Sequence, residues 1–286
     1  MDIIPNEGVC TSVLNTAARH GDPDLATDVL RVFKLSGIAL KEYHFAALIE
    51  AFCRNNQLKE ALITLHIMRS SEILPLPGTV EPILDSIKDI ESLDSAWAII
   101  DEIHKSGGGL DIDALKVIIR ASVLLLDLQR AVGVYKSLRD YGVEPDVTIL
   151  NLLLDGCITA QHRKLGDVLL ADMKAFRVQP NKDTYEKIIQ LCLTQEVYED
   201  AFYYLEEMKA AGFVPPRSVY EALVVKCHSM GDTRVDIALE EMRECGYSMS
   251  KSPRQRRPTK APKTTAGLDE ETREYIKTGG MSRKVS

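Results

Sequence analysis

The cysteines are the residues whose type and spacing most suggest chemistry, because thiolates bind metals and form disulfides. Cys157, Cys192 and Cys227 follow one another at intervals of 35 residues, and Cys53 lies one place off the same series. A zinc site usually takes ligands from a short motif, and the sequence contains neither Cys-x-x-Cys nor His-x-x-x-His. The regular spacing instead predicts a small buried side chain in each of several repeated units. Units stacked about 10 Å apart would hold these thiols too far from one another for disulfides.

The run Gly107–Gly109 is the segment most like a phosphate-binding loop. Such a loop needs a preceding strand and a following Lys-Ser/Thr pair, and the surrounding sequence predicts neither. Carboxylates such as Asp22, Asp24 and Asp94 fall at predicted helix starts and solvent faces. We therefore predict no enzyme activity, no metal site, no cofactor and no small-molecule substrate.

The charge is distributed unevenly along the chain. The formal net charge is −7, but the segment from Lys251 to the end carries 10 basic and 4 acidic residues, a net of +6. The preceding 250 residues therefore carry 25 basic and 38 acidic residues, a net of −13. Because so acidic a body repels phosphate overall, nucleic-acid affinity would require a local basic stripe or the C-terminal segment. No apolar stretch is long enough to predict a membrane span.

The elements that position these residues repeat every 35 residues. A small residue recurs at this interval as Ala26, Ala61, Ala96, Ala131, Gly166 and Ala201. A large apolar residue recurs as Phe33, Met68, Ile103, Leu138, Met173 and Met208. The repeats predicted from these series are 7–41, 42–76, 77–111, 112–146, 147–181, 182–216 and 217–250. Residues 1–6 would end a preceding repeat, and residues 251–286 would form a basic tail.

The spacing of apolar residues within each repeat predicts two antiparallel helices. In the fifth repeat these span residues 148–159 and 165–176. The recurring small residue would let the two helices approach closely. A glycine followed by a proline, as in Gly142 and Pro145, is a typical helix-ending signal. Since one hairpin cannot bury both of its apolar faces, the hairpins must stack. The predicted fold is all-α, a right-handed superhelical solenoid of antiparallel helix hairpins.

The sequence resembles those of pentatricopeptide-repeat (PPR) proteins in its 35-residue period and in its repeat-ending pairs, Pro-Asp at 145–146 and Pro-Asn at 180–181. The segments 146–151 and 206–213 also resemble this family. The tetratricopeptide repeat has a period of about 34 residues and a different aromatic pattern. The resemblance covers residues 2–250 and is nearest to fungal and other organellar members. These include the PPR region of protein-only RNase P-like proteins, here without the nuclease domain. It implies a mitochondrial location.

In this family, two or three side chains of each repeat read one base of single-stranded RNA. The resemblance implies that Asn151 and Asn181 form one such pair, for a pyrimidine. Further implied base contacts are Thr11, Lys116, Asp146 and a stacking Tyr43, and implied phosphate contacts are Arg19, Arg54 and Lys88. The alternative is that the asparagines serve only as helix-start and turn residues and that the cations are solvated surface.

Two functions therefore remain open. One is an organellar adaptor that binds a single-stranded transcript in RNA processing, stability or translation. The other is a non-catalytic scaffold for mitoribosomal or other protein partners, which the acidic body favours. Because Ile4-Pro5-Asn6 matches the closing turn of a repeat, we also expect that Met1 is an internal start within a longer array. The lack of a transit peptide then carries no information about location.

Overall fold

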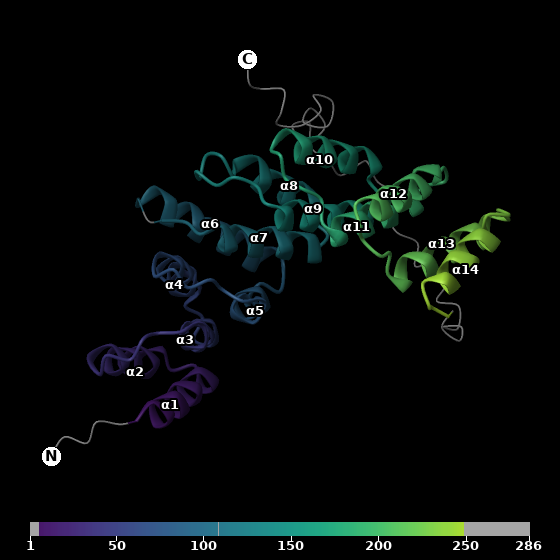
Figure 1. The fold of residues 1–286 in the computed structure, drawn as a ribbon. Coiled ribbons are helices and arrows are strands. Elements are labelled where there is room, and N and C mark those ends of the chain that lie inside the picture. The colour runs from purple at the N-terminus through teal and green to yellow at the C-terminus, as the bar shows by residue number, and fades with distance from the viewer. Residues whose placement is uncertain (1–5, 108, 249–286) are drawn as a thin grey trace. The chain divides into compact units, whose positions relative to one another are not determined.

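The computed structural model describes residues 6–107 and 109–248, and every regular element within these ranges is an α-helix (Figure 1). The all-α fold of paired helices predicted from the 35-residue period is therefore confirmed. The predicted tail at 251–286 lies outside the described residues, as does all of the predicted preceding repeat except Asn6. Within the described ranges, no helix is both long and apolar enough to cross a membrane.

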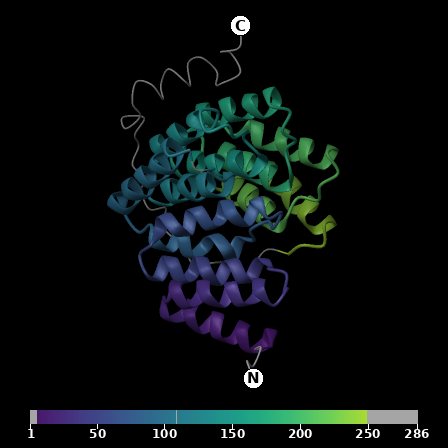
Figure 2. The same ribbon diagram turned by 90° about the vertical axis from the view of Figure 1, so that its left-hand side faces the viewer.

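The chain divides into two compact units. Among the described residues, the first comprises 6–107, 109–125 and 137–143. Its helices are α1 (Glu7–His20), α2 (Pro23–Leu35), α3 (Glu42–Arg54), α4 (Leu58–Ser70), α5 (Pro77–Ser86), α6 (Ile90–Lys105) and α7 (Ile112–Leu124). The first helices of successive repeats pack against one another, α1 on α3, α3 on α5 and α5 on α7. Figure 2 shows the early helices of this unit as successive layers, coloured purple to blue.

Among the described residues, the second unit comprises 126–136 and 144–248. Its helices are α8 (Leu128–Ser137), α9 (Val147–Thr159), α10 (Arg163–Ala175), α11 (Lys182–Leu193), α12 (Glu199–Ala210), α13 (Arg217–Met230) and α14 (Val235–Glu244). Here α11 packs between α9 and α13, which are the first helices of the neighbouring repeats. Each unit thus has a continuous row of first helices.

The core follows the repeat. The recurring large residue is buried in every repeat, as Phe33, Met68, Ile103, Leu138, Met173 and Met208, with Met242 in the last. The recurring alanines Ala26, Ala61, Ala96, Ala131 and Ala201 are completely buried. At Gly166, which takes the alanine's place in the fifth repeat, an added Cβ would lie 2.2 Å from the Leu191 Cδ2 atom of the next repeat. The small residue therefore also makes room for the neighbouring hairpin.

The turns that close the repeats use a left-handed residue, as the glycine signals predict. Gly37, Gly107, Gly142 and Gly212 have φ between +69° and +82°. Glu72 and Arg177 take the same conformation in the second and fifth repeats, with φ of +60° and +57°. A side chain is disfavoured there, so these two turns are held by the packing of the helices around them.

The helices of the fifth repeat begin one or two residues earlier than predicted, at Val147 and Arg163. His162 explains the second difference, because its Nδ1 atom accepts a hydrogen bond of 3.2 Å from the Leu165 backbone N–H. Histidine is an uncommon helix cap, and the sequence pattern did not suggest it. Burial lowers the pKa of His162, which favours the neutral ring that can accept this bond.

Two of the glycines within helices of the second unit, Gly133 and Gly166, give a matched test of this packing. Gly133 on α8 is exposed, and an added Cβ would meet nothing within 4 Å. Gly133→Ala should raise the free energy of unfolding by about 0.5–1 kcal/mol, because alanine loses less backbone entropy on folding. Gly166→Ala must displace the buried Leu191 and should lower the free energy of unfolding by about 1–3 kcal/mol. Urea denaturation measures both; equal gains would contradict the packing role of Gly166.

Candidate nucleic-acid interface

The residues predicted to read bases lie where the first helix of a repeat begins. Asp146 and Asn181 are the capping residues of α9 and α11. Their Oδ1 atoms each accept a 2.9 Å hydrogen bond from a backbone N–H, that of Ile149 and that of Thr184. Asn and Asp are favoured at this position because their short side chains satisfy a free N–H of the first turn. Both side chains are therefore engaged in helix capping.

The structure brings the predicted pair Asn151 and Asn181 together. The Asn151 Nδ2 group donates to Asn181 Oδ1 at 3.2 Å and to Asp183 Oδ2 at 2.9 Å. The Asn151 Oδ1 atom accepts a 2.8 Å bond from the Thr184 hydroxyl. Asn151 is only 5% exposed, whereas Asn181 is exposed to solvent. The pair is close enough to act on one base, and its base-reading role stays a prediction.

Three further predicted base contacts lie in the first unit. Thr11 is partly exposed on α1, and its hydroxyl donates to the Glu7 carbonyl at 2.8 Å. Tyr43 on α3 is 41% exposed, and the Lys41 Nζ atom lies 5.7 Å from its ring centroid. An exposed ring beside a cation is a suitable stacking surface for a base. Lys116 on α7 is half-buried and pairs with Asp113 of the same helix at 3.2 Å.

The predicted phosphate contacts lie at the ends of three successive first helices. Arg19 is the penultimate residue of α1, Arg54 is the last residue of α3, and Lys88 follows α5 by two residues. All three are exposed, and neither Arg19 nor Lys88 forms an ion pair with another described residue. Arg54 pairs with Glu50 at 2.8 Å. We call Arg19, Arg54 and Lys88 the basic track.

The ends of α1 and α3 are adjacent, because a Cβ added to Gly21 would lie 2.9 Å from the Cβ of Arg54. The packing of α3 on α5 extends the same row toward Lys88. The basic track therefore follows one edge of the first unit, on the same row of helices as Thr11 and Tyr43.

The sequence pattern missed the ion pairs that join neighbouring repeats. Arg120 pairs with Glu81 at 2.8 Å, and Lys187 pairs with Asp155 at 2.6 Å. Arg69 reaches the buried Asp111 at 2.5 Å and also pairs with Asp113. The carboxylates of Glu81 and Asp111 thus both have arginine partners from a neighbouring repeat. Opposite charges about one repeat apart along the chain are the signal that would have found these pairs.

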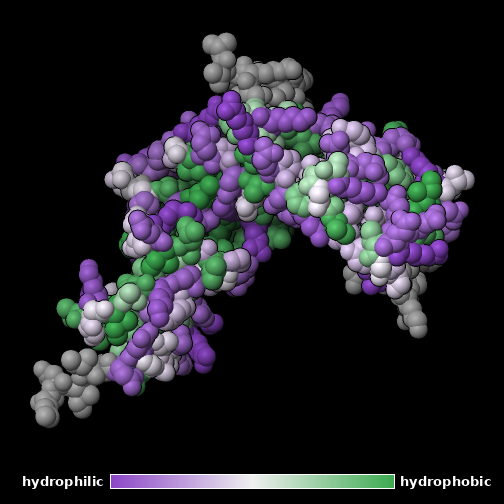
Figure 3. All heavy atoms as spheres, in the orientation of Figure 1, coloured by the Kyte–Doolittle hydropathy of each residue, from purple (hydrophilic) through white to green (hydrophobic). Residues whose placement is uncertain are grey.

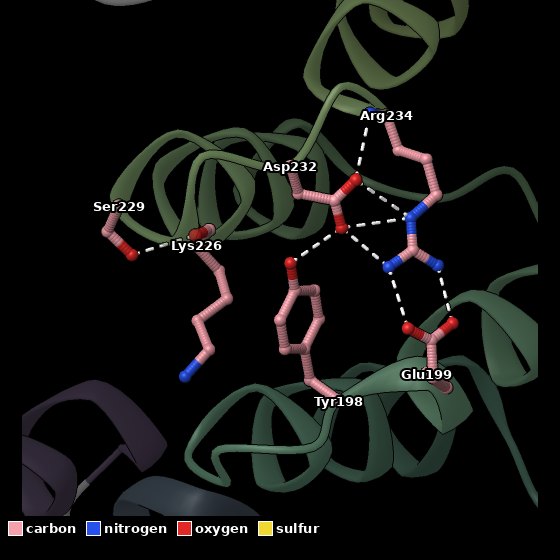
Figure 4. Close-up of polar contacts among 6 residues, drawn as sticks. All are labelled: Tyr198, Glu199, Lys226, Ser229, Asp232 and Arg234. Carbon is pink, nitrogen blue, oxygen red and sulfur yellow. Dashed lines mark hydrogen bonds and ion pairs between the residues drawn. The ribbon is translucent and has the colours of Figure 1, made fainter.

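A denser polar cluster joins α12 to the turn between α13 and α14 (Figure 4). The Tyr198 hydroxyl donates to Asp232 Oδ2 at 2.7 Å. Arg234 binds the same carboxylate and also donates to both Glu199 oxygens, at 2.5 and 2.8 Å. Its guanidinium lies 4.3 Å from the Phe202 ring centroid. The side chains of Tyr198, Glu199, Asp232 and Arg234 thus hold the two elements together.

The electrostatics of this cluster agree with a structural role. Hydrogen bonds from Arg234, followed by that from Tyr198, lower the pKa of Asp232. Burial, followed by the bond to Asp232, raises the pKa of Tyr198 to about 12. The tyrosine thus stays protonated and the aspartate ionised at neutral pH, so neither group is suited to transfer protons. Among the described residues, no group of three or more His, Cys, Asp or Glu side chains could hold a metal ion.

The stacked hairpins of each unit, with a continuous row of first helices, define an α-solenoid repeat protein. A family model described as a pentatricopeptide repeat-containing protein matches residues 7–138. A second, described as a pentatricopeptide repeat domain, matches residues 134–195 and 168–230. The chain belongs to the pentatricopeptide-repeat proteins, and the resemblance drawn from the sequence is confirmed.

The fold is shared with a solved structure. The pentatricopeptide repeat protein PPR10, in complex with an 18-nt psaJ RNA element, matches with a TM-score of 0.54 and 17% identity. This match covers 84% of the chain and 35% of PPR10, so the chain spans about a third of that protein. The PPR domain of Arabidopsis thaliana protein-only RNase P 1, in complex with tRNA, matches with a TM-score of 0.39 and 16% identity. That match covers 65% of the chain and 97% of the domain. None of the curated proteins matches this chain in sequence.

The cluster around Asp232 predicts a dependence of stability on pH. Because the pKa of Asp232 is lowered in the folded state, its stabilising effect is present above the unfolded value of about 3.9 and is lost as the pH falls below it. Asp232→Asn should therefore lower the melting temperature at pH 7, and the difference from wild type should shrink toward pH 3. Asp236→Asn, on the exposed first turn of α14, is the control and should change little. An equal deficit of Asp232→Asn at both pH values would contradict this role.

Proposed function

We propose that this chain is a non-catalytic adaptor that holds single-stranded RNA along the first helices of its repeats. The observation that carries the proposal is that the exposed basic track and the exposed ring of Tyr43 lie on one row of first helices, the track at the helix ends and Tyr43 at a helix start. Cations and exposed aromatic rings are the groups that hold a single strand without regard to sequence. PPR10, which shares the fold, was solved with an 18-nt RNA element, and this supports the same partner class. The family resemblance supports a mitochondrial transcript as the target.

In this proposal the protein breaks no bond, and its effect is to mask or expose a transcript for processing, stability or translation. The basic track and Tyr43 belong to the first unit, so we place the main phosphate contacts there. On the first helices of the second unit, Lys187 is neutralised by Asp155 and Asp183. Those neutralised charges support the second candidate, a protein-interaction scaffold that docks on the mitoribosome or another assembly.

Charge reversal on the basic track separates these two candidates. Arg19→Glu with Lys88→Glu should weaken binding of an RNA pool of random sequence and reduce the dependence of binding on salt. For single strands, each lost phosphate contact lowers the slope of log affinity against log salt by about 0.7, so the pair should lower it by about 1.4. Fluorescence anisotropy at several salt concentrations measures both quantities.

The matched control reverses two cations on α2 instead, Arg31→Glu with Lys34→Glu, both of which are exposed on a second helix. It should retain a slope within about 0.5 of wild type. If wild type binds no single strand, or if both double variants lose the same slope, the adaptor proposal is wrong and the scaffold is favoured. Imaging of the tagged full-length protein with a mitochondrial marker tests the location.

A further inference from the structure

The amide of Asn151 already makes three of its four possible hydrogen bonds within the protein. A primary amide has two N–H donors, and here the Nδ2 group donates to two oxygens, Asn181 Oδ1 and Asp183 Oδ2. The carbonyl oxygen accepts from the Thr184 hydroxyl, which is itself buried. Asn151 is only 5% exposed, and a base edge can accept from its Nδ2 group only if one of these two donated bonds is replaced.

The three partners differ in how readily they can be replaced. Asn181 and Thr184 also each accept a bond from the other's backbone N–H at the cap of α11, and removing either side chain would damage the start of that helix. The Asp183 side chain is 56% exposed and forms its own 3.3 Å ion pair with Lys187. Asp183 is the second residue of α11, and the helix cap is Asn181 instead. Asp183 is therefore the partner of Asn151 whose replacement should cost the fold least.

The charge of Asp183 also acts against a bound strand. Its carboxylate lies next to the predicted reading pair, and Asp155 is joined to it through Lys187. A phosphate that approached this repeat would meet two carboxylates and one cation. Both effects, the occupied amide and the local negative charge, act in the same direction.

We propose that Asp183 is a specificity-determining residue that silences the fifth repeat. Its carboxylate accepts a hydrogen bond from the Asn151 amide, so this repeat does not discriminate between bases. Any contact with RNA at this repeat is then made through other groups. This inference rests on the proposed function, because it concerns which base of a bound RNA is distinguished. It names Asp183 as a positioning residue that acts through Asn151.

Asp183→Val tests this directly, because it removes both the acceptor and the charge. Wild-type and variant proteins, each the full chain, would be used to select from a random pool of single-stranded RNA. The variant should gain a preference at one base position, with about tenfold or more between the best and worst base. Adding Asn151→Ala to Asp183→Val should abolish that preference. Asp183→Ala provides a second variant with the same expectation, and thermal melts check that each protein folds.

The matched control is Asp24→Val, since Asp24 is likewise the exposed second residue of a helix, α2. If Asp24→Val and Asp183→Val raise affinity equally for all sequences, only charge matters and the inference is overturned. A preference already present in wild type and lost in Asn151→Ala would also overturn it. If Asp183→Val binds RNA without any new base preference, this inference alone is contradicted. If none of the proteins binds RNA, the proposed function is contradicted as well.

Discussion

Burial of apolar surface between neighbouring hairpins is the interaction on which the rest of this structure depends. Within each unit, a hairpin completes its core only against the next hairpin. At Gly166, for example, the lack of a side chain leaves room for Leu191 of the next repeat. Each large side chain of the recurring series, such as Phe33 or Met68, is removed from water and contributes about 1.5–3 kcal/mol. The small residue in every repeat keeps the helices close enough for that burial. Stability is therefore shared among neighbours rather than held by any single repeat.

This stacking also determines what the polar side chains can do. It brings the first helices of neighbouring repeats so close that Lys187 reaches Asp155 and Asn151 reaches Asp183. Groups that would otherwise face a ligand are thereby used between repeats. The basic track lies at the ends of the first helices, and there Arg19 and Lys88 remain exposed. The same packing thus neutralises first-helix cations such as Arg120 and Lys187, whereas Arg19 and Lys88 remain exposed at the helix ends.

The sequence allowed the fold to be predicted well, because the period of buried residues records the packing directly. Ala26 and Phe33 are buried as their spacing indicates, and Gly142 takes the left-handed turn. The site was predicted less completely. The contact between Asn151 and Asp183 joins residues 32 positions apart, and it depends on the rotation between two hairpins. The helix cap formed by His162 depends on a ring orientation that residue type alone does not reveal.

The central claim is that the first helices of this protein hold single-stranded RNA, and crosslinking tests it most directly. Purified full-length protein would be irradiated with a random single-stranded RNA that carries 4-thiouridine, and the crosslinked peptides would be identified by mass spectrometry. We predict crosslinks on α1 and α3, near Tyr43 and the basic track, that disappear when the salt concentration is raised. Crosslinks confined to second helices such as α2 and α4, or none above background, would contradict the account.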